Sequence, residues 1–369
     1  MNDPGGPIPL DQICRGAAWL SQRGDDSDVV VSTRVRLARN LAGLPFASKA
    51  NPDQRRAVVD LVRQGLDRAE LTAGRGVPAR MAWAEINRLS TIDRTLLVER
   101  HLISKEHGKL PGDGSAGPRA VAISLPDEGL SIMVNEEDHL RIQVLGGGRA
   151  LVQGWERIDT VDDQLEAALD YAYSSRFGYL TACPTNVGCA VRMSVMLHLP
   201  ALRLTGELDK VKRAAKDMTL AVRGFYGEGS EAVGDLFQIS NQTTLGKTEA
   251  DILRELDKQI LPEVIEYERA SRRLLVERRR RVLEDHVFRA LGTLRHARLL
   301  APEEALSTLS MVRLGILTGL IRDLEEPLVT QLFVLTQPAH LQKLLGQELD
   351  QQQRREARAD LLRQKLSGN

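Results

Sequence analysis

The sequence is poor in cysteine and in aromatic residues, and it has no long apolar run. Its only cysteines are Cys14, Cys183 and Cys189, and aromatic residues make up 4% of the 369 residues. So few cysteines cannot form a disulfide framework, and no pair has zinc-binding neighbours at the usual spacing. No run of about 18 apolar residues occurs, and residues 1–11 lack the apolar core of a signal peptide. We therefore expect a soluble protein of the reducing cytoplasm.

An excess of charge of either sign is also missing. The chain has 50 Lys plus Arg and 50 Asp plus Glu, which excludes a global attraction to nucleic acid or to an anionic membrane. The length allows two domains. Strand-like alternation stops after Thr248, and helical patterns follow. We predict a short helical segment at residues 1–25, an α+β domain at 26–255 and an all-helical domain at 256–369.

The most unusual stretch is an acidic cluster between two expected strands. Residues 129–134 and 140–145 alternate as strands do, and between them stand five polar residues, Asn135, Glu136, Glu137, Asp138 and His139. Three adjacent carboxylates repel one another. They are tolerable if water solvates them or if a cation faces them, and Arg141 is the first candidate for that cation.

Cations occur at the ends of other expected strands. Arg34 and Arg36 follow the apolar run at residues 29–31. An isolated Arg-x-Arg is more often part of a solvated loop, but guanidinium groups also bind phosphate oxygens in bidentate pairs. Arg192 begins an expected strand, and Arg223 opens a glycine-rich loop that contains Glu228. That loop fits either a mobile lid or an ordinary hairpin loop.

Two further residues have a structural and a functional interpretation. His101 is alone in an expected helix at residues 90–107, where a single histidine is more often structural than catalytic. Cys183 begins a turn of Pro, Thr, Asn and Gly, in which backbone N–H groups favour the thiolate. The alternative for Cys183 is a small buried apolar side chain.

Five segments resemble, in the same order, the ATP:guanidino phosphotransferases, the phosphagen kinase superfamily. They are the nucleotide motif at residues 31–36, the acidic signature at 135–141, the cysteine loop at 183–188, Arg192 in the strand after it, and the glycine loop at 223–231. The resemblance implies an α+β fold: a phosphagen-kinase-like catalytic domain, with an antiparallel sheet flanked by helices as in glutamine synthetase, followed by an all-helical C-terminal domain.

Within the superfamily, the likeness is greatest to the bacterial branch that phosphorylates arginine side chains of proteins. It includes residues 98–104, 239–247 and 334–338. Kinases of free guanidines carry a helical domain of roughly a hundred residues before the nucleotide motif, whereas this motif begins at Ser32. The implied activity is transfer of the ATP γ-phosphate to protein arginine, which marks proteins for Clp-protease degradation. A kinase of free arginine and a weakly active phosphoarginine-binding adaptor are the alternatives.

The resemblance also assigns roles at the site. Glu137 and Glu228 are expected to hold the acceptor guanidinium, and Cys183 to lie beside it. ATP would be bound with Mg²⁺ bridging its phosphates and with no dedicated protein metal site. The expected ATP-binding residues are Ser32, Thr33, Arg34, Val35, Arg36, His101, Arg141, Arg192, Met193, Ser194, Val195, Met196, Arg223, Gly224, Phe225, Tyr226, Gly227 and Glu228.

The C-terminal region has its own expected site and partners. A phosphoarginine-sensing motif of the branch is matched by Arg354, Arg355, Glu356, Ala357, Arg358 and Ala359, with Arg355 where the motif has an aspartate. The implied partners are protein substrates bearing arginine, the Clp protease machinery, a stress-response repressor and a second copy of the chain in a homodimer. Direct nucleic-acid binding and membrane binding are not expected.

Three positions near the expected phosphate site depart from the superfamily pattern. Cys189 and Ala190 stand where a threonine and a glycine are usual, and Met193 replaces a small residue. We expect Met193 to crowd a backbone region close to phosphate.

Overall fold

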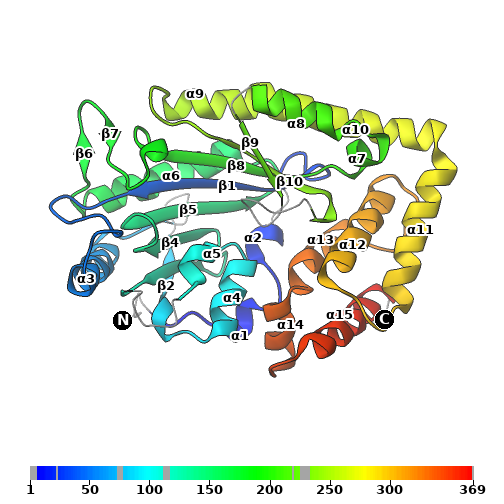
Figure 1. Cartoon of the computed structure of the whole chain (residues 1–369), viewed down its shortest axis with the longest axis horizontal. Helices are drawn as coiled ribbons and strands as arrows, with labels where there is room; N and C mark the ends of the chain where they lie inside the picture. The colour runs from blue at the N-terminus through cyan, green and yellow to red at the C-terminus, as the bar shows by residue number, and fades with distance from the viewer. Residues whose placement is uncertain are drawn as a thin grey trace.

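The computed structural model describes residues 6–21, 24–72, 78–110, 117–217, 220–224 and 233–367, and its centre is an antiparallel sheet of eight strands (Figure 1). The strands pair in the order β2-β3-β4-β5-β1-β8-β10-β9. Their bounds are β1 Val30–Arg39, β2 Arg80–Glu85, β3 Ala120–Leu125, β4 Leu130–Val134, β5 Leu140–Gly147, β8 Val191–His198, β9 Leu220–Gly224 and β10 Leu236–Asn241. Two short strands, β6 Tyr173–Ser174 and β7 Gly178–Tyr179, form a separate ribbon.

The register of the central strands divides their residues between two faces. β1 pairs with β8 so that Arg36 faces Arg192, and with β5 so that Ala38 faces Arg141. Successive side chains point to opposite faces of a sheet. The arginines therefore share one face, which we call the polar face. Val35, with no exposed surface, lies on the other face with the main hydrophobic core.

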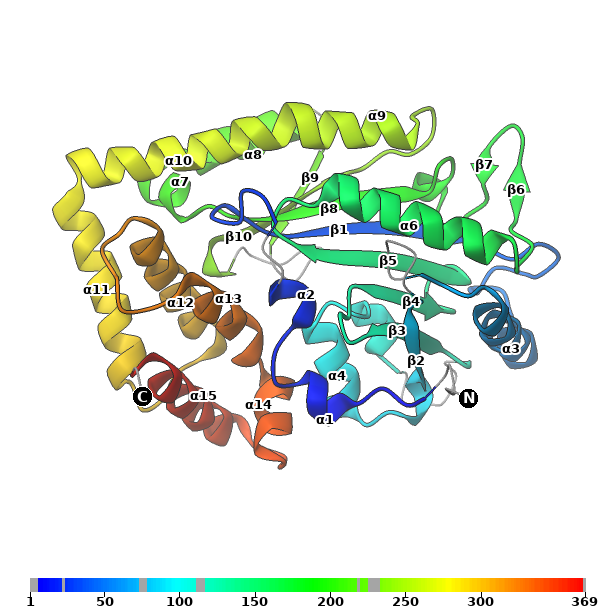
Figure 2. The ribbon, with the colours of Figure 1, turned by 180° about the vertical axis from the view of Figure 1, so that it is seen from behind.

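Helices from both halves of the chain surround the sheet. Figure 2 shows α6 lying along β1 and β5, with α3 beside it. The helices that precede β9 are α1 Leu10–Ile13, α2 Ala18–Ser21, α3 Pro52–Arg68, α4 Thr91–Glu99, α5 Lys105–Gly108, α6 Leu151–Glu166, α7 Pro200–Thr205 and α8 Leu208–Asp217. Those that follow are α9 Glu249–Arg254, α10 Leu261–Arg278, α11 Arg280–His296, α12 Pro302–Leu317, α13 Glu326–Leu335, α14 Pro338–Leu345 and α15 Gln351–Leu366. No helix in the described ranges combines the length and apolar character needed to cross a bilayer.

The sheet and the helical C-terminal region confirm the expected fold class, whereas several helix boundaries were predicted wrongly. The acidic residues that begin at residue 159 predict a helix N-terminus there, but α6 begins at Leu151. Its apolar residues Leu151, Ile158 and Leu165 are buried along one side, and this packing sets the helix rather than the charges. The sequence pattern at residues 9–20 predicts one helix, and the structure has two short ones. The charged pattern at residues 249–294 predicts one long helix, which is interrupted at Arg279.

Buried polar contacts fasten the C-terminal helices to the sheet. Arg313 on α12 is 1% exposed, and its guanidinium donates to the backbone oxygen of Ser27 at 2.7 Å and to the carboxylate of Glu326 at 2.8 Å. It also contacts Nδ1 of His198, at the end of β8, at 2.7 Å. A buried charge is tolerated only when its partners replace water. These partners come from three parts of the chain, so this region has one favourable way to pack.

The close packing of α12 against α11 gives a stability test at two glycines. A Cβ at Gly315 would overlap Val287 Cγ1 and lie 2.9 Å from Ile321 Cδ1, both buried, whereas a Cβ at Gly292 meets no heavy atom within 4 Å. We predict that Gly315→Ala lowers the free energy of unfolding by about 1–3 kcal/mol through overpacking. Gly292→Ala raises it by about 0.5–1 kcal/mol by removing backbone freedom from the unfolded chain. Urea unfolding followed by circular dichroism measures both, and equal effects would contradict this packing.

Candidate functional site

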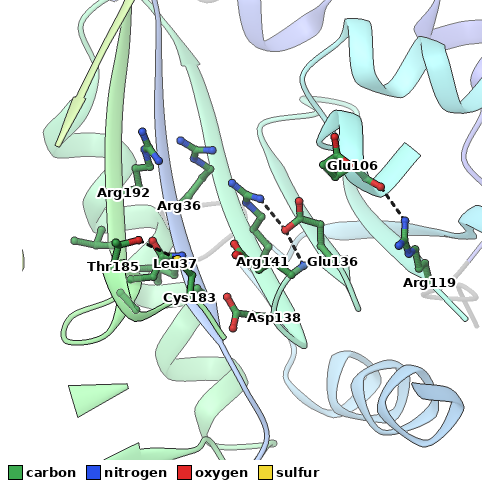
Figure 3. Close-up of a pocket in the computed structure, with 15 residues that line it drawn as sticks. Arg36, Leu37, Glu106, Arg119, Glu136, Asp138, Arg141, Cys183, Thr185 and Arg192 are labelled. Carbon is green, nitrogen blue, oxygen red and sulfur yellow. Dashed lines mark hydrogen bonds and ion pairs between the residues drawn. The ribbon is translucent and has the colours of Figure 1, made fainter. Parts of the chain in front are cut away.

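Four arginines from three adjacent strands form a cationic row on the polar face. Arg34 and Arg36 come from β1, Arg192 from β8 and Arg141 from β5. Figure 3 shows Arg192, Arg36 and Arg141 side by side and pointing the same way. Arg34 Nη2 donates to Gln238 Oε1 at 2.8 Å, and Arg192 Nη2 donates to Ser240 Oγ at 3.1 Å, so β10 holds both side chains in place. The strand register alone brings these cations together.

Arg36 is the most constrained cation of the row. It is 9% exposed, and its Nε has no hydrogen-bond partner among the residues that the structure describes. Burial, together with the neighbouring charges of Arg34, Arg141 and Arg192, holds the Arg36 pKa well below its usual value. Like charges in a poorly solvated site raise the free energy of the empty protein. An anion bound at this row would relieve that repulsion.

The acidic turn between β4 and β5 supplies the carboxylates next to this row. Asn135 adopts a left-handed backbone with φ 59°, and its side chain donates to the backbone oxygens of Arg55 and Pro118. The next residue, Glu136, accepts from Arg141 Nη1 at 2.7 Å and from Ser104 Oγ at 2.6 Å. Although burial alone would raise it, the Glu136 pKa falls to about 2, because Arg141 and these donors stabilise the carboxylate.

The other two carboxylates of the turn have different surroundings. Asp138 is 3% exposed and accepts from Asn40 Nδ2 at 2.6 Å and from the backbone N–H of Ala182 at 2.7 Å. Burial raises its pKa. Glu137 is exposed and lines the adjacent cavity. Asp138 therefore ties the turn to the segment before Cys183, and Glu137 is the carboxylate that a ligand reaches.

The cysteine loop also lines the cavity. Cys183 precedes a short 3₁₀ turn, Pro184–Asn186, and its Sγ lies 3.0 Å from Thr185 Oγ1. Gly188 and Ala190 have φ of 117° and 53°. Ala190 thus keeps the backbone that a glycine adopts easily, and for a side-chain-bearing residue this costs about 1–3 kcal/mol.

These elements enclose a cavity of about 520 Å³, within the usual range for a small-molecule site. Arginines and carboxylates both line it: Arg192, Arg36 and Arg141 lie in a row, and Glu136 and Asp138 lie next to Arg141 (Figure 3). Its walls include Arg36, Arg141, Arg192, Glu106, Arg119, Glu136, Glu137, Asp138, Cys183, Thr185 and Asn186. Such a site can hold an anion and a cation side by side.

His101 lies beside the cationic row. It follows α4 with a left-handed φ of 60°, and its ring makes an edge contact with Trp19. Burial and the nearby charge of Arg34 lower its pKa to about 3. At neutral pH the ring is therefore uncharged and adds no further positive charge to the row.

The strand pleat separates the expected nucleotide-binding residues. The side chains of Thr33, Val35, Met193 and Val195 point away from the polar face, and Met193 and Val195 have no exposed surface. The expectation that Met193 crowds the phosphate region is therefore wrong, since its side chain packs in the core behind the sheet. Ser32, Ser194 and Met196 alternate onto the arginine side by the same register.

Some expected residues lie outside the described structure. Phe225, Tyr226, Gly227 and Glu228 fall in the range 225–232, which the structure does not describe. The backbone of Arg223 and Gly224 belongs to β9, where Arg223 is opposite Gln238. The role of Glu228 thus stays a prediction.

The expected sensing residues lie on α15, far along the chain from the cavity. Arg358 is 1% exposed and donates to the backbone oxygens of Thr336 at 2.8 Å and Leu300 at 2.9 Å. Arg354 donates to the backbone oxygen of Leu349. Glu356 and Ala357 border a groove between α14 and α15, and Arg355 and Ala359 are half-buried and buried. Arg358 therefore holds helix ends together in this conformation.

Sequence reasoning missed several residues that shape the cavity. Glu136 rather than Glu137 holds Arg141, and Glu106 and Arg119 line the cavity from the segments around α5 and before β3. Gln238 and Ser240 on β10 position two arginines. The sequence shows that Gln238 and Ser240 alternate with apolar residues, as on one face of a strand, but it does not show which strand β10 pairs with.

Comparisons with known proteins agree on one family. A model described as ATP:guanido phosphotransferase, C-terminal catalytic domain, matches residues 69–271, and one described as protein-arginine kinase McsB C-terminal domain matches 280–369. A protein-arginine kinase of Halothermothrix orenii is 44% identical over 349 residues, which is 95% of this chain and 96% of the relative. One of Pelotomaculum thermopropionicum is 43% identical over 349 residues, 95% of each chain.

Solved structures show the same fold. A lombricine kinase matches with a TM-score of 0.54 and 25% identity, over 73% of this chain and 72% of that one. The substrate-free duplicated taurocyamine kinase from Schistosoma mansoni matches with a TM-score of 0.54 and 23% identity, over 70% of this chain and 39% of that one. At this identity the second likeness concerns the fold alone.

The repulsion around Arg36 predicts opposite effects on stability and on anion binding. Arg36→Met keeps the side-chain volume and removes a buried charge, so we expect the ligand-free protein to gain about 1–2 kcal/mol in unfolding free energy. We expect ATP affinity to fall at least about tenfold, as for a lost charge-assisted hydrogen bond. Urea unfolding and isothermal titration calorimetry measure the two quantities.

The matched control is Arg80→Met, which removes an exposed arginine from the edge strand β2 of the same sheet. It leaves both quantities nearly unchanged. Unchanged ATP affinity in Arg36→Met would mean that the cationic row is not the phosphate site.

Proposed function

Because the chain belongs to the protein-arginine kinase family of the ATP:guanido phosphotransferases, we propose that it transfers the γ-phosphate of ATP to the guanidino group of arginine side chains in proteins. The observation that carries this assignment is one cavity lined both by a row of arginines and by the carboxylates next to that row. The two substrates, a polyphosphate anion and a guanidinium cation, have the complementary charges.

The cationic row would position the phosphates. Phosphoryl transfer needs little covalent help from the protein and depends on positioning and on fixed charge that matches the transferring group. Arg36, Arg141 and Arg192 present donors to the same cavity, and their strands are hydrogen-bonded neighbours. Because the three strands are neighbours in one sheet, the three guanidinium groups would meet the phosphates from fixed backbone positions.

Glu137 would orient the acceptor. A carboxylate and a guanidinium form charge-assisted hydrogen bonds, which align the attacking nitrogen with the γ-phosphate. The guanidinium must also lose a proton, since its pKa is above roughly 12 and the cation is a poor nucleophile. Glu137 is the exposed carboxylate of the turn, and Glu228 is proposed as its counterpart from the glycine loop. Cys183 lines the same cavity as Glu137.

Mg²⁺ is proposed to enter with ATP. Among the described residues there is no group of three or more His, Cys, Asp or Glu side chains placed to hold a metal ion. Mg²⁺ usually keeps several waters and takes substrate phosphate oxygens as ligands. The bound ion would supply further positive charge to the phosphates. The residues of this chain would then bind the complex through its remaining phosphate oxygens.

The proposal also covers the location and partners of the enzyme, and it is supported there by the resemblance to the bacterial protein-arginine kinases. We propose a cytoplasmic enzyme, acting as a homodimer, whose phosphorylated products are handed to the Clp protease machinery and whose targets include a stress-response repressor. Phosphoarginine sensing by residues 354–359 belongs to the same proposal. Because Arg358 is already bound to backbone carbonyls, phosphoarginine would be bound by the side chains that border the groove between α14 and α15.

The test is an incubation of the purified protein with Mg·ATP and two acceptors, an unfolded arginine-containing protein and free L-arginine. Mass spectrometry under conditions that preserve the acid-labile P–N bond detects the products. Phosphoarginine in the protein acceptor alone is expected. Phosphorylated free arginine alone would favour a free-guanidine kinase, and ATP binding without either product would favour an adaptor.

Substitution of the reachable carboxylate tests the assignment within the site. We predict that Glu137→Gln lowers kcat by at least about a hundredfold, the range for a lost general base, and leaves ATP affinity within about threefold. Glu106→Gln, which removes another carboxylate from the cavity wall, is the control and retains most of kcat. If ATP affinity falls instead of kcat, Glu137 acts on the nucleotide and its role is misassigned.

A further inference from the structure

The N-terminus of α14 is capped by a side chain from a distant part of the chain. Its own preceding residue, Gln337, makes no side-chain cap. Instead, the carboxylate of Glu99, at the end of α4, accepts from the backbone N–H of Ala339 at 2.8 Å and from that of His340 at 3.1 Å. Glu99 is 7% exposed. A carboxylate at a helix N-terminus satisfies free N–H groups and interacts favourably with the helix dipole.

The side chain of His340 extends this contact into a buried chain of hydrogen bonds. Its Nδ1 lies 2.8 Å from Glu99 Oε2, and its Nε2 lies 3.3 Å from Arg100 Nη1. Since an ionised carboxylate only accepts and a guanidinium only donates, the imidazole carries its proton on Nδ1 and is neutral. Arg100, with no exposed surface, also pairs with Glu128 and donates to the backbone oxygen of Gly16.

The residues that follow Glu99 reach the candidate site within five positions. Gln143, on the same strand as Arg141, donates to the backbone oxygen of His101 at 2.6 Å. Ser104 then donates its hydroxyl to Glu136 at 2.6 Å, and Glu136 holds Arg141. The segment 99–104 thus contacts α14 at one end and the Glu136–Arg141 pair at the other.

This segment has little freedom to absorb a displacement. His101 has a left-handed backbone, and the N–H groups of Leu102 and Ile103 both bond to the backbone oxygen of Leu97. Leu102 and Ile103 are buried. A shift of Glu99 must therefore move Ser104 or break one of these bonds. Figures 1 and 2 both show α14 against α4, and α15, which carries residues 354–359, packs on the far side of α14.

We propose that Glu99 and His340 are positioning residues, through which the N-terminus of α14 fixes the Glu136–Arg141 pair of the kinase site. The inference rests on the proposed function for its kinetic readout. It gives the C-terminal helices a direct mechanical connection to the phosphate-binding row, which neither Glu99 nor His340 touches in the described structure. Coupling of this kind is a free energy shared by two sites, so each site must respond to the other.

The kinetic test uses Glu99→Gln, which keeps a hydrogen-bond acceptor for the helix N-terminus and removes the charge. We expect the KM for ATP to rise at least about fivefold, within the range of known coupling between sites. The matched control is Lys343→Met, which removes the other tether of α14, the ion pairs with Asp11 and Asp93, without touching segment 99–104. It leaves the KM for ATP unchanged. An unchanged KM in Glu99→Gln, or equal effects of both variants, overturns the proposal.

A double-mutant cycle separates coupling from general damage. Ser104→Ala acts at the site end of the segment, and Glu99→Gln at the α14 end. If the segment transmits position, the effect of the double variant on the KM for ATP is smaller than the product of the two single effects by at least about threefold. Independent effects, which multiply, overturn the connection.

A measurement on the wild-type protein needs neither a variant nor catalysis. Hydrogen–deuterium exchange of a peptide that includes Ala339 and His340 reports the amides that donate to Glu99. We expect binding of ATP to slow this exchange, while the exchange of α11 stays unchanged. Unaltered exchange at saturating ATP overturns the inference, whereas a wild-type protein that binds ATP but transfers no phosphate refutes only the proposed function.

Discussion

The constraint on which the site depends is the repulsion among guanidinium groups that the strand register forces together. Hydrogen bonding of β5, β1 and β8 fixes Arg141, Arg36 and Arg192 on one face, and no rotamer change takes a residue to the other side of a sheet. Glu136 offsets one charge, and solvent in the cavity screens the others. The empty protein therefore stores electrostatic free energy that a polyphosphate releases on binding.

Packing on the apolar side of the sheet offsets the repulsion among the arginines on the polar face. Val35, Met193 and Val195 alternate with the arginines along the same strands and pack in the main core. Burying each such side chain contributes about 1.5–3 kcal/mol. Along these strands, the apolar residues at every second position thus stabilise the fold, and the arginines at the positions between them serve binding. This division explains why Met193 fits: its volume is accommodated by the core and not by the phosphate site.

The features that could be predicted from the sequence are those set by residues close together in the chain. The sequence placed Arg34 and Arg36 at the end of a strand at residues 29–31, whereas both lie within β1, Val30–Arg39. The strand–turn–strand pattern did locate the acidic turn. The pairing register of β10 with β8 cannot be predicted from the sequence, so the contacts of Gln238 and Ser240 with the arginines could not be foreseen. The sequence also does not show which of two adjacent glutamates points inward. That is decided by the left-handed backbone of Asn135 and by Ser104, which is distant in the chain.

The electrostatics of the site also limit what can cause a pH dependence. The Glu136 pKa of about 2 is below its unfolded value, so the stabilisation it provides is complete above about pH 4.5 and is lost only as the pH falls toward 2. His101, with a pKa of about 3, is neutral at every pH well above that value. Neither group changes its charge near neutral pH. A change in rate between pH 6 and 9 therefore cannot come from the titration of Glu136 or His101, and the cationic row keeps these two neighbours in one charge state over that range.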